Sequence, residues 1–332
     1  MDILFMDDII DLIKWAIGST YLKEYDSYEI EPICYMFVAK SGGGKSFSME
    51  QFEKGDKYDS EVVFTEDEWT YVDVFNKIYE QIKKGKKLMF TKDFSQMIQR
   101  MSSTVRRLMG VLLKITERKG LYQIKDKSGL TRDIVPLKLS FITGITPQTL
   151  DKNITNWYDS GLINRLILIS WRLNAKQERV ISKHKAEKYA SKSKNKYKTD
   201  VVKLNYKKMS VTISKKLCAR LESCAIRANQ RYFNYYLERN RYFEYLYYMK
   251  NKKEKDEDKN ILADFLSRGM SEEEMEIYRS SYIRLYEKFV TIARGKALTE
   301  GREKVSEKDI DEVIRILDKY CNLDFNLVGD EK

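Results

Sequence analysis

The fold is decided by the segment at residues 33–46, which reads ICYMFVAKSGGGKS. Its first six residues form an unbroken apolar run that Pro32 precedes. A run of this length, bounded by turn residues, predicts a strand buried on both faces of a sheet. The three glycines at positions 42–44 predict a tight turn, and residues 46–52 predict the start of a helix. A strand, a glycine-rich loop and a helix are therefore expected in this order.

The loop has the spacing of a P-loop, in which a small residue and four others precede Gly-Lys-Ser. In such a loop the backbone N–H groups surround phosphate oxygens, and the following helix N-terminus adds positive potential. Lys45 is expected to reach the β- and γ-phosphates of ATP, and Ser46 to bind Mg²⁺. The alternative is a glycine-rich turn whose lysine and serine are incidental. The predicted nucleotide-binding residues are Ala39, Lys40, Ser41, Gly42, Gly43, Gly44, Lys45 and Ser46.

Strands and helices alternate beyond this segment, which is typical of an α/β fold with a mostly parallel sheet core flanked by helices. Four more strands are predicted, at residues 61–65, 88–91, 137–143 and 162–171. Helices are predicted at residues 3–17, 72–82 and 96–119, and a β-hairpin at residues 121–124 and 131–135. The core is therefore expected to be of the P-loop NTPase kind.

The composition changes after residue 171. Lysine and arginine dominate residues 172–208, where only Glu178, Glu187 and Asp200 oppose them. This stretch is either a phosphate-binding surface or a solvated loop. Residues 220–249 predict a helix rich in tyrosine, and the spacing of Tyr232, Tyr235, Tyr236, Tyr242 and Tyr245 favours packing over base stacking. We divide the chain into an N-terminal helical segment (1–29), the ATPase core (30–171), a basic and aromatic insertion (172–270) and a helical lid (271–332).

The formal net charge of +11 favours a polyanionic partner such as DNA, although a Lys/Glu-rich thermophile surface would also produce a charged chain. The four cysteines form no CxxC pair and there is one histidine, so a zinc site is not expected. No apolar run is long enough to span a membrane, and the acidic N-terminus is unlike a signal peptide. A cytoplasmic protein with reduced thiols is expected.

A carboxylate at the end of a neighbouring strand would complete a phosphate-transfer site, because it holds Mg²⁺ and polarises water. Asp93, after the predicted strand at residues 88–91, is the first candidate for both roles, with Lys92 where an acid is usual. The acidic turn at residues 66–68 is an alternative source. Asp93 could instead cap the next helix.

Two further polar residues end or begin predicted strands. Thr146 could orient the attacking water or touch the γ-phosphate, or it could belong to an ordinary strand-end turn. Arg165 could enter a neighbouring subunit's phosphate site as an arginine finger, or it could be a surface residue. The candidate catalytic residues are therefore Lys45, Asp93, Thr146 and Arg165.

Taken in order, these segments resemble the AAA+ replicative helicase ATPases, especially the minichromosome-maintenance group and related plasmid- and virus-borne ATPases. Residues 92–97 (KDFSQM) resemble the Walker B segment, with Asp93 on the catalytic glutamate and Lys92 on the Mg²⁺-binding aspartate. Residues 142–147 resemble the sensor-1 strand, with Thr146 on its polar residue, and residues 160–166 resemble the arginine-finger segment.

The resemblance implies a ring of six, with Arg165 acting in trans and DNA passing through the centre. It places a DNA-contacting hairpin at residues 125–132, a helical lid at residues 293–317 and a sensor-2 arginine at Arg279 or Arg284.

Three functions follow as hypotheses. The first is an ATP-dependent DNA helicase or translocase in replication of a small genome or mobile element. The second is a nucleotide-gated DNA-binding or loading protein with weak hydrolysis, which Lys92 motivates. The third is a DNA-packaging or remodelling motor.

Overall fold

The structure is a computed structural model, and it describes residues 6–24, 30–53, 56–69, 74–98, 102–117, 121–125, 131–136, 138–190, 201–251 and 267–323. Its centre is a five-stranded sheet in the order β3-β4-β7-β1-β8. The strands are β1 (Cys34–Val38), β3 (Val63–Thr65), β4 (Leu88–Thr91), β7 (Ser140–Ile145) and β8 (Ile167–Ser170). All four neighbouring pairs are parallel. The predicted α/β architecture with a parallel sheet is confirmed.

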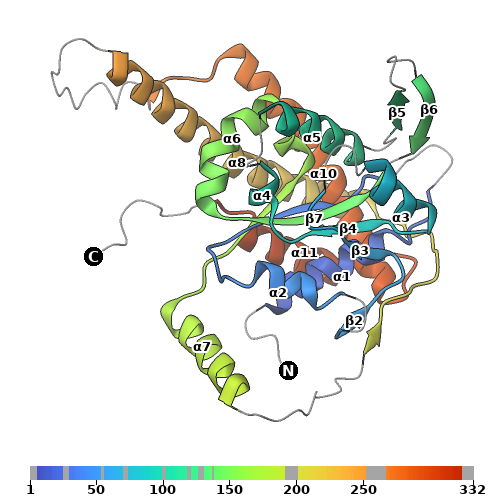
Figure 1. The fold of residues 1–332 in the computed structure, drawn as a ribbon. Helices are drawn as coiled ribbons and strands as arrows, with labels where there is room; N and C mark the ends of the chain where they lie inside the picture. The colour runs from blue at the N-terminus through green and yellow to red at the C-terminus, as the bar shows by residue number, and fades with distance from the viewer. Residues whose placement is uncertain are drawn as a thin grey trace.

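The strand order places β1 between β7 and β8. From β1 the chain moves outward to β3, whereas from β7 it crosses in the other direction to β8. Because parallel crossovers are right-handed, connections in opposite directions cover opposite faces of the sheet. Figure 1 shows this arrangement, with α1 (Asp7–Ser19) and α2 (Lys45–Glu50) on one face and α4 (Phe94–Ile98), α5 (Ser102–Ile115) and α6 (Pro147–Asp159) on the other. β1 and β7 therefore mark the point at which the connections change direction, and α/β proteins typically bind ligands at the carboxyl ends of the strands at such a point.

Two predicted strands have different bounds in the structure. The strand predicted at residues 162–171 is shortened to β8, because Ile163–Arg165 forms a 3-10 turn (η2) closed by the Arg165 N–H on the Leu162 carbonyl at 2.9 Å. The strand predicted at residues 137–143 begins at Ser140 and continues to Ile145, where its register with β1 ends opposite Val38. Strand pairing, rather than local apolarity, sets these limits, because Ser140 pairs with Leu88 of β4, and Ile145 and Ile167 pair with β1.

The helical predictions within the core also change in detail. The helix predicted at residues 72–82 consists of a π-helical turn, Val74–Tyr79, followed by α3 (Glu80–Lys83). The helix predicted at residues 96–119 corresponds to α4 and α5, and residues 99–101 lie outside the described part of the chain. Helix α6, which begins at the Thr146-Pro147 pair, was not predicted. Pro147 occupies the first turn of α6, where a missing N–H does no harm.

The predicted hairpin is present as β5 (Leu121–Lys125) paired antiparallel with β6 (Thr131–Pro136), and Figure 1 shows it standing apart from the sheet. Its turn, residues 126–130, lies outside the described residues, so the predicted DNA-contacting segment 125–132 is described only at its two ends. A second small pairing was not predicted. β2 (Tyr58–Asp59) pairs in parallel with β9 (Val202–Lys203), which joins the basic stretch to the core.

The remaining helices are α7 (Ala175–Ala190), α8 (Lys215–Asn251), α10 (Glu272–Thr299) and α11 (Glu307–Tyr320). Residues 271–274 read Ser-Glu-Glu-Glu, which is the pattern of a capping box, and Ser271 and Glu274 exchange the two hydrogen bonds of that motif at the start of α10. α10 packs against α1 and α8, and α8 also packs against α11. The Tyr232 hydroxyl donates to the Leu168 carbonyl at 2.7 Å, which attaches α8 to the sheet.

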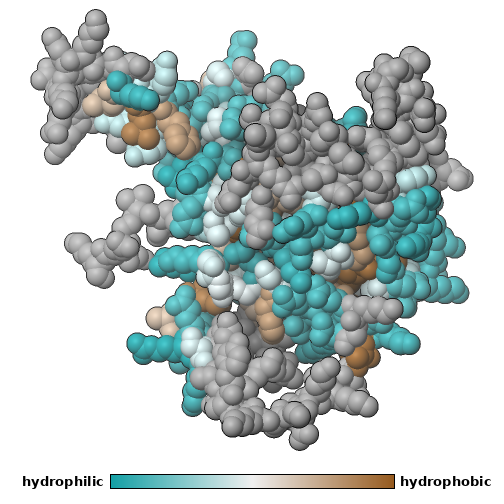
Figure 2. All heavy atoms as spheres, viewed as in Figure 1, coloured by the Kyte–Doolittle hydropathy of each residue, from teal (hydrophilic) through white to brown (hydrophobic). Residues whose placement is uncertain are grey.

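The aromatic residues of α8 behave in two ways. Tyr232, Tyr235 and Tyr236 are buried, as their spacing predicted. Tyr242 does not follow that prediction, since 41% of its surface is exposed. Phe243 and Tyr247 are exposed as well. In Figure 1 this end of α8 extends beyond the body at the upper left, and Figure 2 shows apolar side chains there. Helical spacing alone could not reveal that α8 outruns the elements that cover it.

Candidate phosphate-binding site

The glycine-rich loop, residues 39–44, is curled between the end of β1 and the start of α2. The Gly43 N–H donates to the Lys40 carbonyl at 3.0 Å, which closes the turn. Gly44 is the N-cap of α2 with φ at +87°, a backbone conformation that residues other than glycine rarely adopt. No side chain caps α2, so its first N–H groups are not satisfied in the usual way. This geometry suits an acceptor that comes from outside the chain.

Lys45 lies on the loop that precedes it. Its Nζ donates to the Ala39 carbonyl at 2.5 Å and to the Lys40 carbonyl at 3.0 Å. Partial burial lowers the pKa of Lys45, and the negative charge of Asp93 opposes that shift. The ammonium is therefore held by two neutral carbonyls in a place where charge is poorly solvated. A phosphate oxygen would be a stronger acceptor, because hydrogen bonds between ionised groups are the strong ones.

The start of α2 and the residue after β4 both approach β7 at Gly144. A Cβ added to this glycine would lie 3.3 Å from Lys45 Cβ and 3.0 Å from the Lys92 carbonyl oxygen. The aliphatic part of Lys45 thus crosses the end of β7 in a space that only a glycine leaves open. The loop, β7 and the end of β4 are brought together at the carboxyl edge of the sheet.

Trp171 holds the loop from the other side. Its indole N–H donates to the Gly43 carbonyl at 2.8 Å, and its ring meets Phe37 of β1 edge-on with centroids 5.4 Å apart. Trp171 was not among the predicted site residues. The available signal was a tryptophan at the end of an apolar strand, because a buried indole N–H needs an acceptor.

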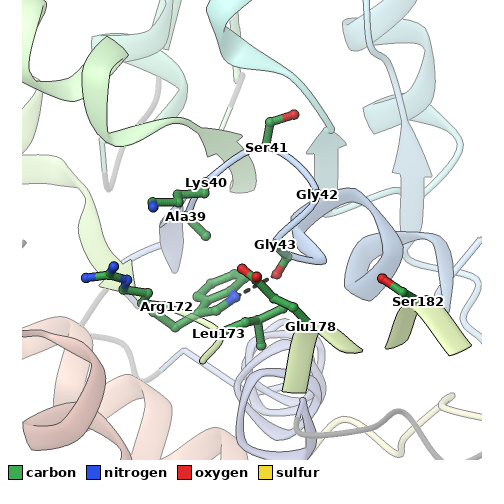
Figure 3. Close-up of a pocket in the computed structure, with 10 residues that line it drawn as sticks. Ala39, Lys40, Ser41, Gly42, Gly43, Arg172, Leu173, Glu178 and Ser182 are labelled. Atoms are coloured by element: carbon green, nitrogen blue, oxygen red, sulfur yellow. Dashed lines mark hydrogen bonds between the residues drawn. The ribbon is translucent and has the colours of Figure 1, made fainter. Parts of the chain in front are cut away.

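A cavity of about 360 Å³ adjoins the loop on the β8 side. Residues 39–43 form one wall, and residues 171–173 together with Glu178 and Ser182 of α7 form the other, as Figure 3 shows. Its size falls within the range of small-molecule sites. The contribution of α7 was not predicted.

Asp93 lies at the end of β4, near enough to Lys45 for their charges to interact. Its Oδ1 accepts the Ser95 N–H at 2.9 Å, so Asp93 caps α4 as the alternative interpretation proposed. The side chain is exposed. Capping by one oxygen is compatible with a further role for the carboxylate.

Lys92 points its ammonium at a group of three carboxylates. Nζ lies 2.6 Å from Glu53, 3.7 Å from Glu50 and 3.9 Å from Asp67. Burial alone would lower the pKa of Lys92, but the hydrogen bond and charge of Glu53 outweigh it and raise the pKa. Asp67, from the acidic turn, also accepts the Lys92 backbone N–H at 2.8 Å. The acidic turn therefore reaches the end of β4, where its carboxylate is paired with Lys92.

Thr146 is the N-cap of α6, and its hydroxyl oxygen accepts the Thr149 N–H at 3.3 Å. Thr149 also contacts Ser95, which begins α4, with 3.4 Å between their hydroxyls. Thr146 thus has the strand-end role that the alternative interpretation described. It lies at the same edge of the sheet as the loop.

Arg165 lies at the amino ends of the strands, opposite the loop, because it precedes β8 in a parallel sheet. Its guanidinium donates to the Gly161 carbonyl at 2.7 Å and to Glu117 at 3.2 Å. Burial and the charge of the nearby Arg284 lower the pKa of Arg165. Arg165 and Arg284 therefore form a pair remote from the loop of their own chain. Arg279 is exposed.

Within the part of the chain that the structure describes, no group of three or more acidic, cysteine or histidine side chains could hold a metal ion. Nor is any helix among those residues long and apolar enough to cross a bilayer. No protein-family model matches the chain, and no curated protein matches it.

Proposed function

We propose that the protein is a P-loop ATPase, similar to the AAA+ replicative helicases that its motif order resembles, and that it acts on DNA as a helicase or translocase. The observation that carries the proposal is the position of residues 39–46 at the carboxyl edge of a parallel sheet. There Lys45 crosses Gly144, and a glycine with positive φ begins an uncapped helix. A cavity that could take the rest of a nucleotide adjoins the loop.

Binding would begin with an exchange of partners at Lys45. The ammonium would leave the Ala39 and Lys40 carbonyls for β- and γ-phosphate oxygens, while N–H groups of the loop and of α2 receive the remaining charge. The pKa of Lys45 would then rise, because an anion stabilises the protonated amine.

Mg²⁺ fits the residues present in a limited way. The Ser46 hydroxyl and the Asp93 carboxylate would hold it, with phosphate oxygens and water as its other ligands, because Mg²⁺ needs only one or two protein carboxylates. The ion would neutralise charge on the phosphates. Asp93, or Asp67 after release from Lys92, would orient the attacking water.

A second candidate function has its own support, which is the pairing of Lys92 with Glu50, Glu53 and Asp67. A strand end that presents an ammonium group in place of a second carboxylate favours slow hydrolysis. The protein would then be a nucleotide-gated DNA-binding or loading protein, in which binding rather than turnover drives the change of state.

One experiment tests both functions. Nucleotide affinity is measured by calorimetry, and ATP turnover with and without DNA by phosphate release, for the native chain and for Lys45→Ala. We expect Lys45→Ala to weaken ATP binding by about 100-fold, since it removes a charge-assisted contact. DNA-stimulated turnover supports the helicase or translocase. Binding with negligible turnover supports the gated DNA-binding protein, and absence of ATP binding by the native chain contradicts both.

A further inference from the structure

Helix α7 contributes to the loop cavity and also carries much of the basic stretch. It begins at Ala175, shortly after Trp171 donates to the Gly43 carbonyl. Glu178 and Ser182, one helical turn apart, line the cavity. Figure 1 shows α7 at the periphery of the molecule, below the sheet. One face of this helix therefore meets the loop while others face solvent.

The basic residues of α7 lie on a different side. Lys176, Arg179 and Lys183 are all exposed and recur at intervals of three and four residues. At about 100° per residue they share an arc of roughly 60°, centred about a third of a turn from Glu178 and Ser182. The three cations thus form one outward stripe, and the acidic residue of this part of the helix is on the cavity face.

A stripe of cations on an exposed helix fits the phosphodiester backbone of a nucleic acid, because each neutralised phosphate releases counterions. An anionic membrane surface fits less well. Membrane-binding helices carry a broad apolar face opposite their cations. Among the described side chains of α7, the exposed large apolar one is Val180.

Arg172 connects the stripe with the loop. It lies in the exposed segment that leads into α7, and it lines the cavity together with Lys40. In Figure 3 both side chains extend to the same side of the loop. Arg172 precedes Lys176, the first cation of the stripe, by four residues. A nucleic acid strand that follows the stripe to the start of α7 would therefore approach Arg172, which also lines the cavity beside the loop. Two anions that share cations weaken each other's binding.

We propose that Lys176, Arg179 and Lys183 bind the phosphodiester backbone of a nucleic acid strand. We also propose that ATP bound at the loop and nucleic acid bound on α7 weaken each other's binding, because both lie beside Arg172. The strand contact stands whether or not the loop binds nucleotide. The antagonism rests on the proposed function.

The strand contact is tested by anisotropy with a labelled oligothymidylate of about 20 nucleotides, longer than one single-strand site, over a range of salt concentrations. The full chain is compared with a Lys176→Ala, Arg179→Ala, Lys183→Ala variant. We expect the slope of log affinity against log salt to become shallower by about 2, because three phosphate contacts are lost. The matched control is Lys215→Ala, Lys304→Ala, Lys308→Ala, which removes the same charge from exposed positions at the start of α8 and around the start of α11. We expect it to keep the native slope.

Equal slopes for the two triple variants would overturn the strand contact. So would loss of binding to phosphatidylserine vesicles, with unchanged oligonucleotide binding, in the α7 variant.

For the antagonism, a non-hydrolysable ATP analogue should weaken oligonucleotide binding by about three- to ten-fold at low salt and less at high salt. An analogue that binds the loop but leaves strand affinity unchanged, or tightens it, overturns the antagonism alone. An analogue that does not bind contradicts the proposed function and leaves the strand result standing.

Discussion

At the scale of single residues, the loop is held by contacts that its own sequence does not contain. Trp171 donates to Gly43 across 128 positions of the chain, and Gly144 leaves space for the stem of Lys45. Both contacts fix the loop before any ligand arrives. Such preorganisation lowers the entropy lost on binding.

Trp171→Phe tests this role of the indole. The variant keeps the aromatic packing on Phe37 but loses the hydrogen bond to Gly43, which is worth about 1 kcal/mol. We expect ATP affinity to fall by about three- to ten-fold, measured by calorimetry. Trp157→Phe is the matched control, since Trp157 of α6 is a buried tryptophan that packs on Phe94 of α4. It should reduce the free energy of unfolding without a change in ATP affinity. The same loss of affinity in both variants would contradict the role of Trp171.

At the scale of the elements, helix caps and strand pairing position the site. Asp93 and Thr146 begin α4 and α6 at the edge where the loop lies. At the other end of the chain Ser306 and Asp309 form a capping box for α11, and Arg302 donates two hydrogen bonds to the Asp309 carboxylate, at 2.5 and 2.6 Å.

Asp309 gives this cap a pH dependence. Burial alone would raise the pKa of Asp309, but the hydrogen bonds from Arg302 and Ser306 outweigh it and lower the pKa. A carboxyl with a lowered folded-state pKa stabilises the fold above its unfolded pKa, and this contribution is lost as pH falls through the folded value. We expect Asp309→Asn to reduce the free energy of unfolding by about 2 kcal/mol at pH 7.

The difference between Asp309→Asn and the native chain should shrink below about pH 4, as the native carboxyl takes up its proton. Urea unfolding from pH 7 to pH 3 measures it. Asp311→Asn, which affects an exposed pair with Arg220, is the control and should change stability by less than about 1 kcal/mol. A deficit for Asp309→Asn that stays constant down to pH 3 would show that the carboxylate charge is not its cause.

At the scale of the whole molecule, the chain presents its two proposed catalytic parts at opposite edges of the sheet. The loop follows β1, whereas Arg165 precedes β8 and lies beside Arg284. Arg165 therefore cannot serve the loop of its own chain, and a ring in which it meets a neighbour's nucleotide is the arrangement that would use it. Arg284 accompanies it there, which argues against a sensor role for Arg284 at its own loop.

Mixing two inactive variants tests the ring. Lys45→Ala keeps Arg165, and Arg165→Ala keeps the loop, so about a quarter of the interfaces in a random ring would contain both parts. We expect ATP turnover to reappear in the mixture, measured by phosphate release. Glu117→Ala is the control for structural damage, because it breaks the same ion pair and leaves the arginine. Activity of Arg165→Ala by itself would contradict the trans role.

Much of the fold could be predicted because its signals are local. The apolar run at residues 33–38, the glycines after it and the capping pair Ser271 and Glu274 act within a few residues of one another. The limits of β7 and β8 could not be predicted, because pairing with β4 and β1 sets them. In the site, the spacing of the loop residues was sufficient to predict the position of Lys45. For Asp93 the sequence left two interpretations, and the hydrogen bond from the Ser95 N–H shows that Asp93 caps α4.

The sequence by itself determined the strand, loop and helix around Lys45, the parallel α/β class and the start of α10. Short-range periodicity, backbone freedom and capping are sufficient for these. Only the tertiary structure decided that Trp171 holds Gly43, that Lys92 turns toward Glu53 and that α7 forms a wall of the loop cavity. Each of these joins segments distant in the chain, and such contacts depend on how the whole sheet and its helices pack.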